Sequence, residues 1–261
     1  MILRPDGDGG SVVAIGQASH AWLSGQLARA WGNEEFAAPA PFEDVVLGAL
    51  QHDIGMAEWD RAPERNPDTG LPRQFYELDR RTHLKLWTDA PGHVVTQSRY
   101  AALLVSLHGT GLYERFPPRT EDPEILAAVD TYMNGQRALQ EELTRQLGLE
   151  PDELLRNQAL LAVLDDLSLA ICRDQREPHT TPPAPTTDTG DGTPQRQLVL
   201  FATGPQPDTY ILDPWPFAER TLTVVAEGRV LTGPAPDRAA LQTALDGAPV
   251  RRIVATLDAP G

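Results

Sequence analysis

The chain has 261 residues, of which 41% are hydrophobic and 23% charged, and these values suit one large domain or one domain with a small appendage. Its formal net charge of −15 argues against nucleic acid or an anionic membrane as the main partner. The single cysteine, Cys172, excludes an intrachain disulfide, and no apolar run approaches the roughly 18 residues that a membrane span needs. The first residues do not resemble a signal peptide, so we expect a cytoplasmic protein.

Short strands are predicted at residues 1–5 and 11–15, on either side of the turn sequence DGDGG. Helices are then predicted from apolar residues that recur at spacings of three and four. The first helix, for example, carries His20, Leu23 and Leu27 on one stripe. The predicted helices cover residues 17–31, 41–55, 97–113, 123–148 and 151–173.

Residues 60–98 differ from the helices that flank them, because they are rich in proline, charge and turn formers. We expect a long loop here, and long ordered loops in compact domains are often functional. It contains Arg61, Arg65, Arg73 and the pair Arg80–Arg81, together with the only lysine, Lys85. Arginine matches phosphate bidentately. Ordinary solvated charge is the alternative, and the functional interpretation predicts that Arg61, Arg65 and Arg73 bind an anionic substrate.

After residue 196, the spacing of apolar residues changes from a helical to a strand-like period. Residues 174–196 are rich in proline and threonine and predict a flexible linker. Strands are predicted at 197–203, 208–213, 220–228, 229–233 and 250–258, with a short helix at 237–247. The predicted fold is therefore mainly α: an HD-domain-like helical bundle at 1–173, the linker, and a small β-rich C-terminal α+β unit at 197–261. The N-terminal strands are candidates to pair with that unit's sheet.

Five metal-capable side chains lie on the apolar faces of four predicted helices: His20, His52, Asp53, His108 and Asp165. A buried polar group without a partner is costly, and a metal ion accepts imidazoles and carboxylates together. Helical bundles build metal sites from inward-facing residues of separate helices. We therefore predict a site for one or two divalent ions, with Mn, Ni, Mg, Zn and Fe as candidates. Any one of these residues taken singly also fits a hydrogen-bonded core position.

The order His, His-Asp, Asp resembles the HD superfamily of metal-dependent phosphohydrolases. In that superfamily the last ligand is an aspartate followed two positions later by leucine, which implies Asp165 rather than Asp166. Many members carry a catalytic lysine or glutamate soon after the HD pair. Here Met56 and Ala57 occupy those positions, and the next acidic residues are Glu58 and Asp60.

The chain resembles a second family more closely, the uncharacterised bacterial "domain of unknown function 3891". The resemblance covers nearly the whole chain. It rests on the stretches QASHAWLSGQLARAWG, HDIGMAEWD, NPDTGLPRQF, LLVSLHGTGL, LDDLSLAIC and LDPWPF. It implies a fold and a metal site but no established reaction.

Three functions follow as hypotheses. The first is a metal-dependent hydrolase of a small phosphate ester or nucleotide, in which Asp53 orients the attacking water and His108, Glu58 or Asp60 moves protons. His108 is alternatively a further ligand or a donor that supports one. The second is an HD-type di-iron oxygenase, which the extra histidine favours. The third is a non-catalytic, metal-stabilised sensor or interaction module. The sequence leaves the oligomeric state open, with a homodimer as one option.

Overall fold

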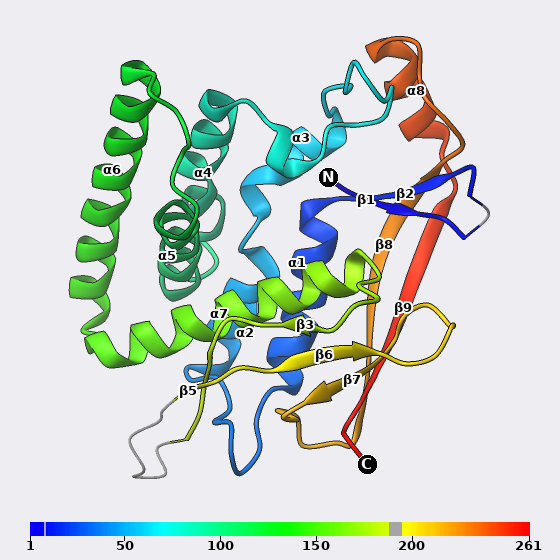
Figure 1. Ribbon diagram of the computed structural model, residues 1–261. Coiled ribbons are helices and arrows are strands. Elements are labelled where there is room, and N and C mark those ends of the chain that lie inside the picture. The colour runs from blue at the N-terminus through cyan, green and yellow to red at the C-terminus, as the bar shows by residue number, and fades with distance from the viewer. Residues whose placement is uncertain (8, 188–194) are drawn as a thin grey trace.

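The computed structural model of the protein describes residues 1–7, 9–187 and 195–261 (Figure 1). The helices are α1 (Gln17–Ala30), α2 (Phe42–Gln51), the 3-10 turn η1 (Ile54–Met56), α3 (Ala57–Arg61), the 3-10 turn η2 (Phe75–Glu77), α4 (Arg80–Val94), α5 (Arg99–Arg115), α6 (Pro123–Leu147), α7 (Pro151–Cys172) and α8 (Arg238–Gly247). The strands are β1 (Ile2–Pro5), β2 (Val12–Ile15), β3 (His179–Thr180), β4 (Ala184–Pro185), β5 (Gln195–Arg196), β6 (Val199–Ala202), β7 (Thr209–Asp213), β8 (Thr221–Leu231) and β9 (Val250–Asp258).

Seven of these strands form one curled sheet in the order β1-β2-β8-β9-β7-β6-β3, and β4 and β5 form a separate pair. Neighbouring strands of the large sheet are antiparallel, except that β7 and β9 are parallel. Val12 of β2 lies opposite Leu231 of β8, which confirms that the N-terminal strands join the C-terminal sheet. The sheet therefore joins the two ends of the chain.

The expectation of a mainly α, HD-like bundle with a small β-rich unit is wrong. Helices make up about 49% of the chain, and the seven-stranded sheet is a layer of comparable importance. Sequence periodicity detects each strand by itself, whereas the size of a sheet depends on which distant strands pair. The five short strands predicted after residue 196 were therefore interpreted as a small separate unit, although β1 and β2 belong to the same sheet.

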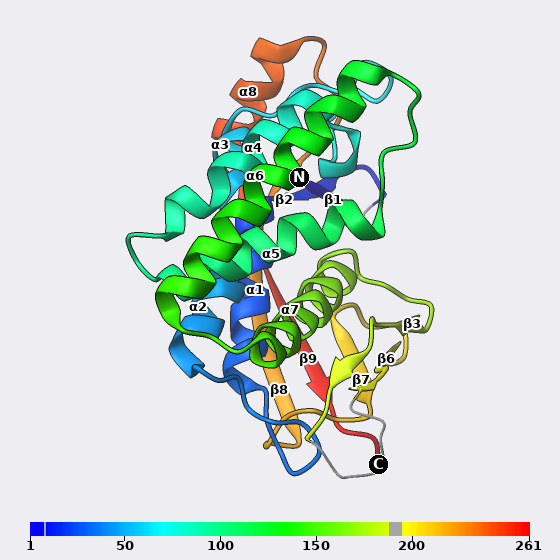
Figure 2. The same cartoon turned by 90° about the vertical axis from the view of Figure 1, so that its left-hand side faces the viewer.

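Helix α1 lies between strands β8 and β9 on one side and helices α4, α5 and α6 on the other, as Figures 1 and 2 show, whereas α8 lies apart, beside β8. Helix α1 contacts β8, α2 and α7, and the Gln26 side chain exchanges hydrogen bonds with the Val225 backbone of β8. Its apolar stripe, with Leu23 and Leu27, belongs to a buried core shared by helices and sheet. A Cβ atom at Gly25 would lie 2.3 Å from Leu50 Cγ, so this glycine allows α1 and α2 to approach closely. Helices and sheet thus share one core, with α1 at its centre.

The predicted loop at 60–98 is wrong over its second half, where α4 begins at Arg80. Asp79 caps this helix by accepting a hydrogen bond from the Thr82 backbone, and its buried face includes Leu84, Trp87 and Val94. The charges and the proline at position 91 hide the apolar spacing of this helix in the sequence. Only the part before α4 remains as irregular chain with short helical turns.

The stretch predicted as a flexible linker contributes β3, β4 and β5 to the structure, and Thr181 and Ala184 are buried. Part of that prediction falls on residues 188–194, which lie outside the described residues. In the described part of the chain, no helix is long and apolar enough to cross a lipid bilayer.

Candidate metal centre

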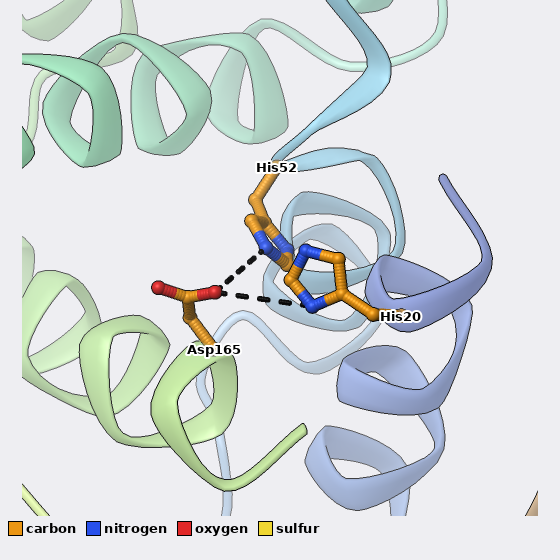
Figure 3. Close-up of side chains that lie close together, drawn as sticks. All are labelled: His20, His52 and Asp165. Carbon is orange, nitrogen blue, oxygen red and sulfur yellow. Dashed lines mark ion pairs between the residues drawn. The ribbon is translucent and has the colours of Figure 1, made fainter. Parts of the chain in front are cut away.

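The five predicted ligands lie close together in the interior of the protein and come from four helices. His20 lies in the first turn of α1, His108 in the second half of α5 and Asp165 in the second half of α7. His52 caps the C-terminus of α2, and Asp53 follows it at the start of η1. All five side chains are buried. Figure 3 shows His20, His52 and Asp165 pointing toward one another from separate helices.

A tight turn after α2 explains the adjacent His-Asp pair. Asp53 leaves the helical region with φ −108° and ψ 18°, so the chain turns directly after the two ligands. A Cβ atom at Gly55 would lie 2.5 Å from the backbone oxygen of Leu86 and 2.8 Å from Ala90 Cβ. Gly55 therefore allows the turn to press against α4. This contact holds the pair at the junction of α2 and α4.

The hydrogen bond of His52 determines which ring nitrogen faces the cluster. His52 Nδ1 lies 2.8 Å from the carbonyl oxygen of Ala49, and because a carbonyl can only accept, Nδ1 carries the proton. In the neutral ring, Nε2 then presents a lone pair. This atom is buried and makes no regular hydrogen bond among the described residues, and its nearest carboxylate oxygen, Asp165 Oδ1, lies 3.3 Å away. The arrangement suits a metal ligand whose second nitrogen is fixed by the backbone.

His20 is oriented in the same way by Ser168. The Ser168 hydroxyl donates to the Asp165 carbonyl oxygen at 2.8 Å, so its oxygen accepts from His20 Nδ1, also at 2.8 Å. His20 Nε2 lies 2.7 Å from Asp53 Oδ2. A lone pair on nitrogen facing a carboxylate oxygen at this distance requires a positive charge between them. That charge is either a second proton on the ring or a bound cation.

The electrostatics of the cluster reflect the same need for positive charge. Burial lowers the pKa of His52, but the Asp53 and Asp165 carboxylates outweigh it and raise that pKa to about 9. Burial raises the pKa values of Asp53 and Asp165, and the neighbouring histidines reverse this and hold both below the usual range. The two carboxylates thus stay ionised and attract a cation into the cluster.

The donor set fits a divalent metal ion. Two groups of three residues each place one potential ligand atom per residue within 4.8 Å of the others. The first group is His20, His52 and Asp165, and the second is His52, Asp53 and His108. Because the two groups share His52, together they have room for one ion or for two neighbouring ions. Imidazole and carboxylate ligands suit Zn, Mn, Fe and Ni.

His108 connects the cluster to an aromatic wall. Its ring centroid lies 4.8 Å from that of His52 and 5.5 Å from that of Trp87. Burial lowers the pKa of His108 to about 4. Trp87 Nε1 donates to His83 Nε2 at 3.1 Å, so His83 Nδ1 carries the proton and donates to the Tyr113 hydroxyl at 2.7 Å. His83 is thus held in place by hydrogen bonds at both ring nitrogens.

A pocket of about 450 Å³ opens onto this cluster. Asp53, His108 and Asp165 form part of its lining. Its walls are mainly apolar and aromatic, with Trp87 and Tyr113 among them, and they come from η2, α4, α5 and α7. The lining also contains three arginines: Arg80, Arg115 and Arg173. A buried polar cluster at the end of an apolar pocket is typical of a ligand-binding or active site.

A family model described as "Protein of unknown function (DUF3891)" matches residues 1–233. The chain belongs to the DUF3891 family. The matched region contains all five clustered residues and every arginine of the pocket, and it ends just after β8. No curated protein and no solved structure matched the chain. Family membership therefore confirms that resemblance and assigns no reaction.

Two of the catalytic residues predicted for the DUF3891 chain lie away from this pocket. Glu58, Asp60 and Arg61 line a different surface hollow, beside β8 and α8. Asp60 is engaged by the backbone N–H of Gln17 and by the amino group of Met1, and burial raises its pKa. Glu58 and Asp60 were predicted to be catalytic because they follow the His-Asp pair in sequence. The chain turns at η1, however, and the residues after it line a different hollow from the pair.

Two further predicted substrate-binding arginines of the DUF3891 chain have structural partners. Arg65 donates from Nε to the carbonyl oxygen of Ala235 at 2.7 Å. Arg73 pairs with Glu64 at 3.3 Å and donates to the Glu77 carbonyl. Neither lines the pocket described above. These contacts fix the irregular segment between α3 and α4.

Several pocket residues of the DUF3891 chain escaped the sequence analysis. Gln17 donates to Asp53 Oδ2 at 2.9 Å, and its position one helical turn before His20 was an available signal. Asp166 lines the pocket, and its Oδ2 lies 2.6 Å from His179 Nε2. Arg115 and Arg173 each stand about two turns after a ligand of the same helix, but periodicity alone does not show that a pocket runs along that direction.

Proposed function

We propose that the protein is a metal-dependent hydrolase of a small phosphate ester. The observation that carries the proposal is the buried cluster in which the Nε2 atoms of His20 and His52 face the Asp53 and Asp165 carboxylates at the end of a pocket. His20, His52, Asp53 and Asp165 would hold the metal, with His108 as a further ligand or as a proton carrier. The order of these ligands along the chain matches that of the HD superfamily, and the proposal rests on this donor set rather than on the fold.

The metal, when bound, would polarise a phosphoryl oxygen and promote ionisation of a water molecule. The residues of the chain supply the rest. Gln17 fixes the Asp53 carboxylate by donating to its Oδ2 atom, so that the other oxygen can orient the nucleophile. His108 faces the pocket, and because burial lowers its pKa to about 4, its ring is neutral at neutral pH and offers a lone pair as a proton acceptor. The aromatic wall excludes bulk water from the reacting group.

The test is a screen of phosphate esters on protein loaded with Mn²⁺, Ni²⁺, Co²⁺ or Zn²⁺, combined with metal analysis of the same samples. The chain offers a matched pair of histidine variants. His52→Ala should lose both bound metal and turnover, whereas His93→Ala, an exposed position on α4, should keep both. Turnover by wild type that does not exceed that of His52→Ala for any ester and metal would reject the hydrolase.

One observation favours a second candidate, a di-iron oxygenase. The group formed by His52, Asp53 and His108 gives the cluster a second potential metal position beside the first. Purification without chelator followed by iron analysis separates the two candidates. About two irons per chain with oxygen consumption would favour the oxygenase, since paired carboxylate and histidine ligands in helical proteins commonly hold two irons. Firm binding of a single redox-inactive ion favours the hydrolase.

A further inference from the structure

The three arginines of the pocket share an unusual setting. Each guanidinium carbon lies over an aromatic ring of the same pocket: Arg80 over Tyr113 at 5.5 Å, Arg115 over Phe116 at 5.9 Å and Arg173 over Phe75 at 5.5 Å. Stacking on an aromatic face holds a guanidinium without occupying its N–H donors in the plane. These donors remain available to a ligand, apart from the one that Arg80 directs at the Tyr113 hydroxyl.

None of the three makes an ion pair with a carboxylate in the part of the chain that the structure describes. Neighbouring arginines behave differently: Arg73 pairs with Glu64, and Arg81 pairs with Glu124 at 2.6 Å. Arg115 influences the pKa of Asp166 only from beyond ion-pair distance. In a chain with a net charge of −15, three arginines without carboxylate partners around one pocket indicate that the partner is an external anion.

The positions of two arginines along their helices place the positive charge away from the metal ligands. Arg115 follows His108 by seven residues, which corresponds to roughly 10 Å along an α-helix axis. Arg173 follows Asp165 by eight residues, or roughly 12 Å. Arg115 also stacks on the residue that follows it, so its guanidinium stays at the outer end of α5. Arg115 and Arg173 therefore line the outer part of the pocket, the His/Asp cluster forms its inner end, and Arg80 lies over Tyr113 of the wall between them.

The wall between these two regions is aromatic. Trp87 and Tyr113 are buried, whereas Tyr76 and Phe116 are 61% and 63% exposed and lie at the mouth. Flat apolar walls favour a ligand with a flat apolar body. A ligand that fills the pocket thus meets the His/Asp cluster, where a metal would bind, at one end, an aromatic wall in the middle and arginines at the outer end.

We propose that Arg80, Arg115 and Arg173 recognise a second anionic group of the substrate, remote from the group bound at the His/Asp cluster. The substrate class is a small phosphate ester with a flat apolar body and a carboxylate or phosphate at its other end. This inference rests on the proposed hydrolase for the identity of the first group. It replaces Arg61, Arg65 and Arg73 as the anion-binding residues.

Binding of non-hydrolysable phosphonates to Mn²⁺-loaded protein tests the inference without reliance on turnover. Phenylphosphonate and 4-phosphonobenzoate differ only in a second anionic group, and calorimetry gives the dissociation constant of each. A charge-assisted hydrogen bond contributes about 1.5–3 kcal/mol, so we expect 4-phosphonobenzoate to bind at least about tenfold more tightly. 1,4-Phenylenediphosphonate shows whether a second phosphonate is preferred to the carboxylate.

The variants Arg80→Gln, Arg115→Gln and Arg173→Gln should each reduce this preference, and the triple variant should remove it while binding of phenylphosphonate changes little. Arg81→Gln is the matched control, because Arg81 adjoins Arg80 but is paired with Glu124 outside the pocket. Equal affinity of wild type for phenylphosphonate and both two-anion ligands, no binding of any of them, or a preference that survives in the triple variant overturns the inference. A preference that depends on the arginines, without turnover of any phosphate ester, would support the inference and reject the hydrolase.

Discussion

Replacement of Asp165 by asparagine should destabilise the metal-free protein strongly, and replacement of Asp166 should not. Asp165 is buried, with Oδ1 3.3 Å from His52 Nε2 and Oδ2 3.9 Å from His108 Nε2. Loss of one partner from a buried ion pair costs about 3–5 kcal/mol, because the other charge stays buried without compensation. Asp166 instead pairs with His179, and both side chains are more than a quarter exposed, so that pair contributes about 0–1 kcal/mol.

The assay is urea unfolding of wild type, Asp165→Asn and Asp166→Asn, followed by circular dichroism at pH 7 in the presence of a chelator. In a thermal scan, each kcal/mol corresponds to about 2–4 °C for a chain of this size, so Asp165→Asn should melt about 6–20 °C lower. Addition of Zn²⁺ at about 100 times its dissociation constant should stabilise wild type and Asp166→Asn by about 2.7 kcal/mol, and Asp165→Asn by much less. Equal losses from the two substitutions would show that the cluster does not depend on Asp165.

Two further predictions concern pH and packing. In the chelated protein, the free energy of unfolding should be greatest near pH 6.5. The pKa of His52 is raised from 6.5 to about 9, so its stabilising contribution is complete below pH 6.5 and is lost as the pH rises to 9. The pKa of His83 is lowered to about 4, so the folded protein loses stability as the pH falls from 6.5 to 4. Urea midpoints measured from pH 4 to pH 10 check this, and a midpoint that keeps rising between pH 7 and pH 9 would contradict it. Gly55→Ala should destabilise the protein by about 1–3 kcal/mol, because the new methyl group meets the rigid backbone of α4 at 2.5 Å. Gly135→Ala is the control, since nothing lies within 4 Å of its Cβ position in α6, and it should stabilise the protein by about 0.5–1 kcal/mol; equal effects of the two substitutions would refute the packing argument.

The helices and the ligand cluster could be predicted because both depend on local spacing. A helix of 3.6 residues per turn puts Val45, Ala49 and His52 on one face, and a buried face with metal-capable residues is visible in the sequence. The bounds of α1, α5 and α7 lie within two residues of the expected ones. Long-range pairing is not visible in this way. The partnership of β2 with β8 determines the size of the sheet, and no local signal records it.

The anion-binding residues escaped prediction for a related reason. Arg61, Arg65 and Arg73 were selected because they follow the His-Asp pair in sequence, but η1 redirects the chain and intramolecular partners take up Arg65 and Arg73. Arg115 and Arg173 stand at helix ends, where arginine is favoured next to the terminal carbonyl groups in any protein. Their special position appears only once the directions of α5 and α7 in space are known.

The placement of β1 and β2 beside β8 has a consequence for biosynthesis. The ribosome delivers the two N-terminal strands first, yet their partner Leu231 emerges more than two hundred residues later. During that interval the apolar side chains of Ile2, Val13 and Ile15, all buried in the finished protein, have no sheet to join. Pairings between such distant segments make folding slow and leave strand edges exposed to aggregation. The nascent chain is therefore expected to need protection by chaperones until β8 has been synthesised.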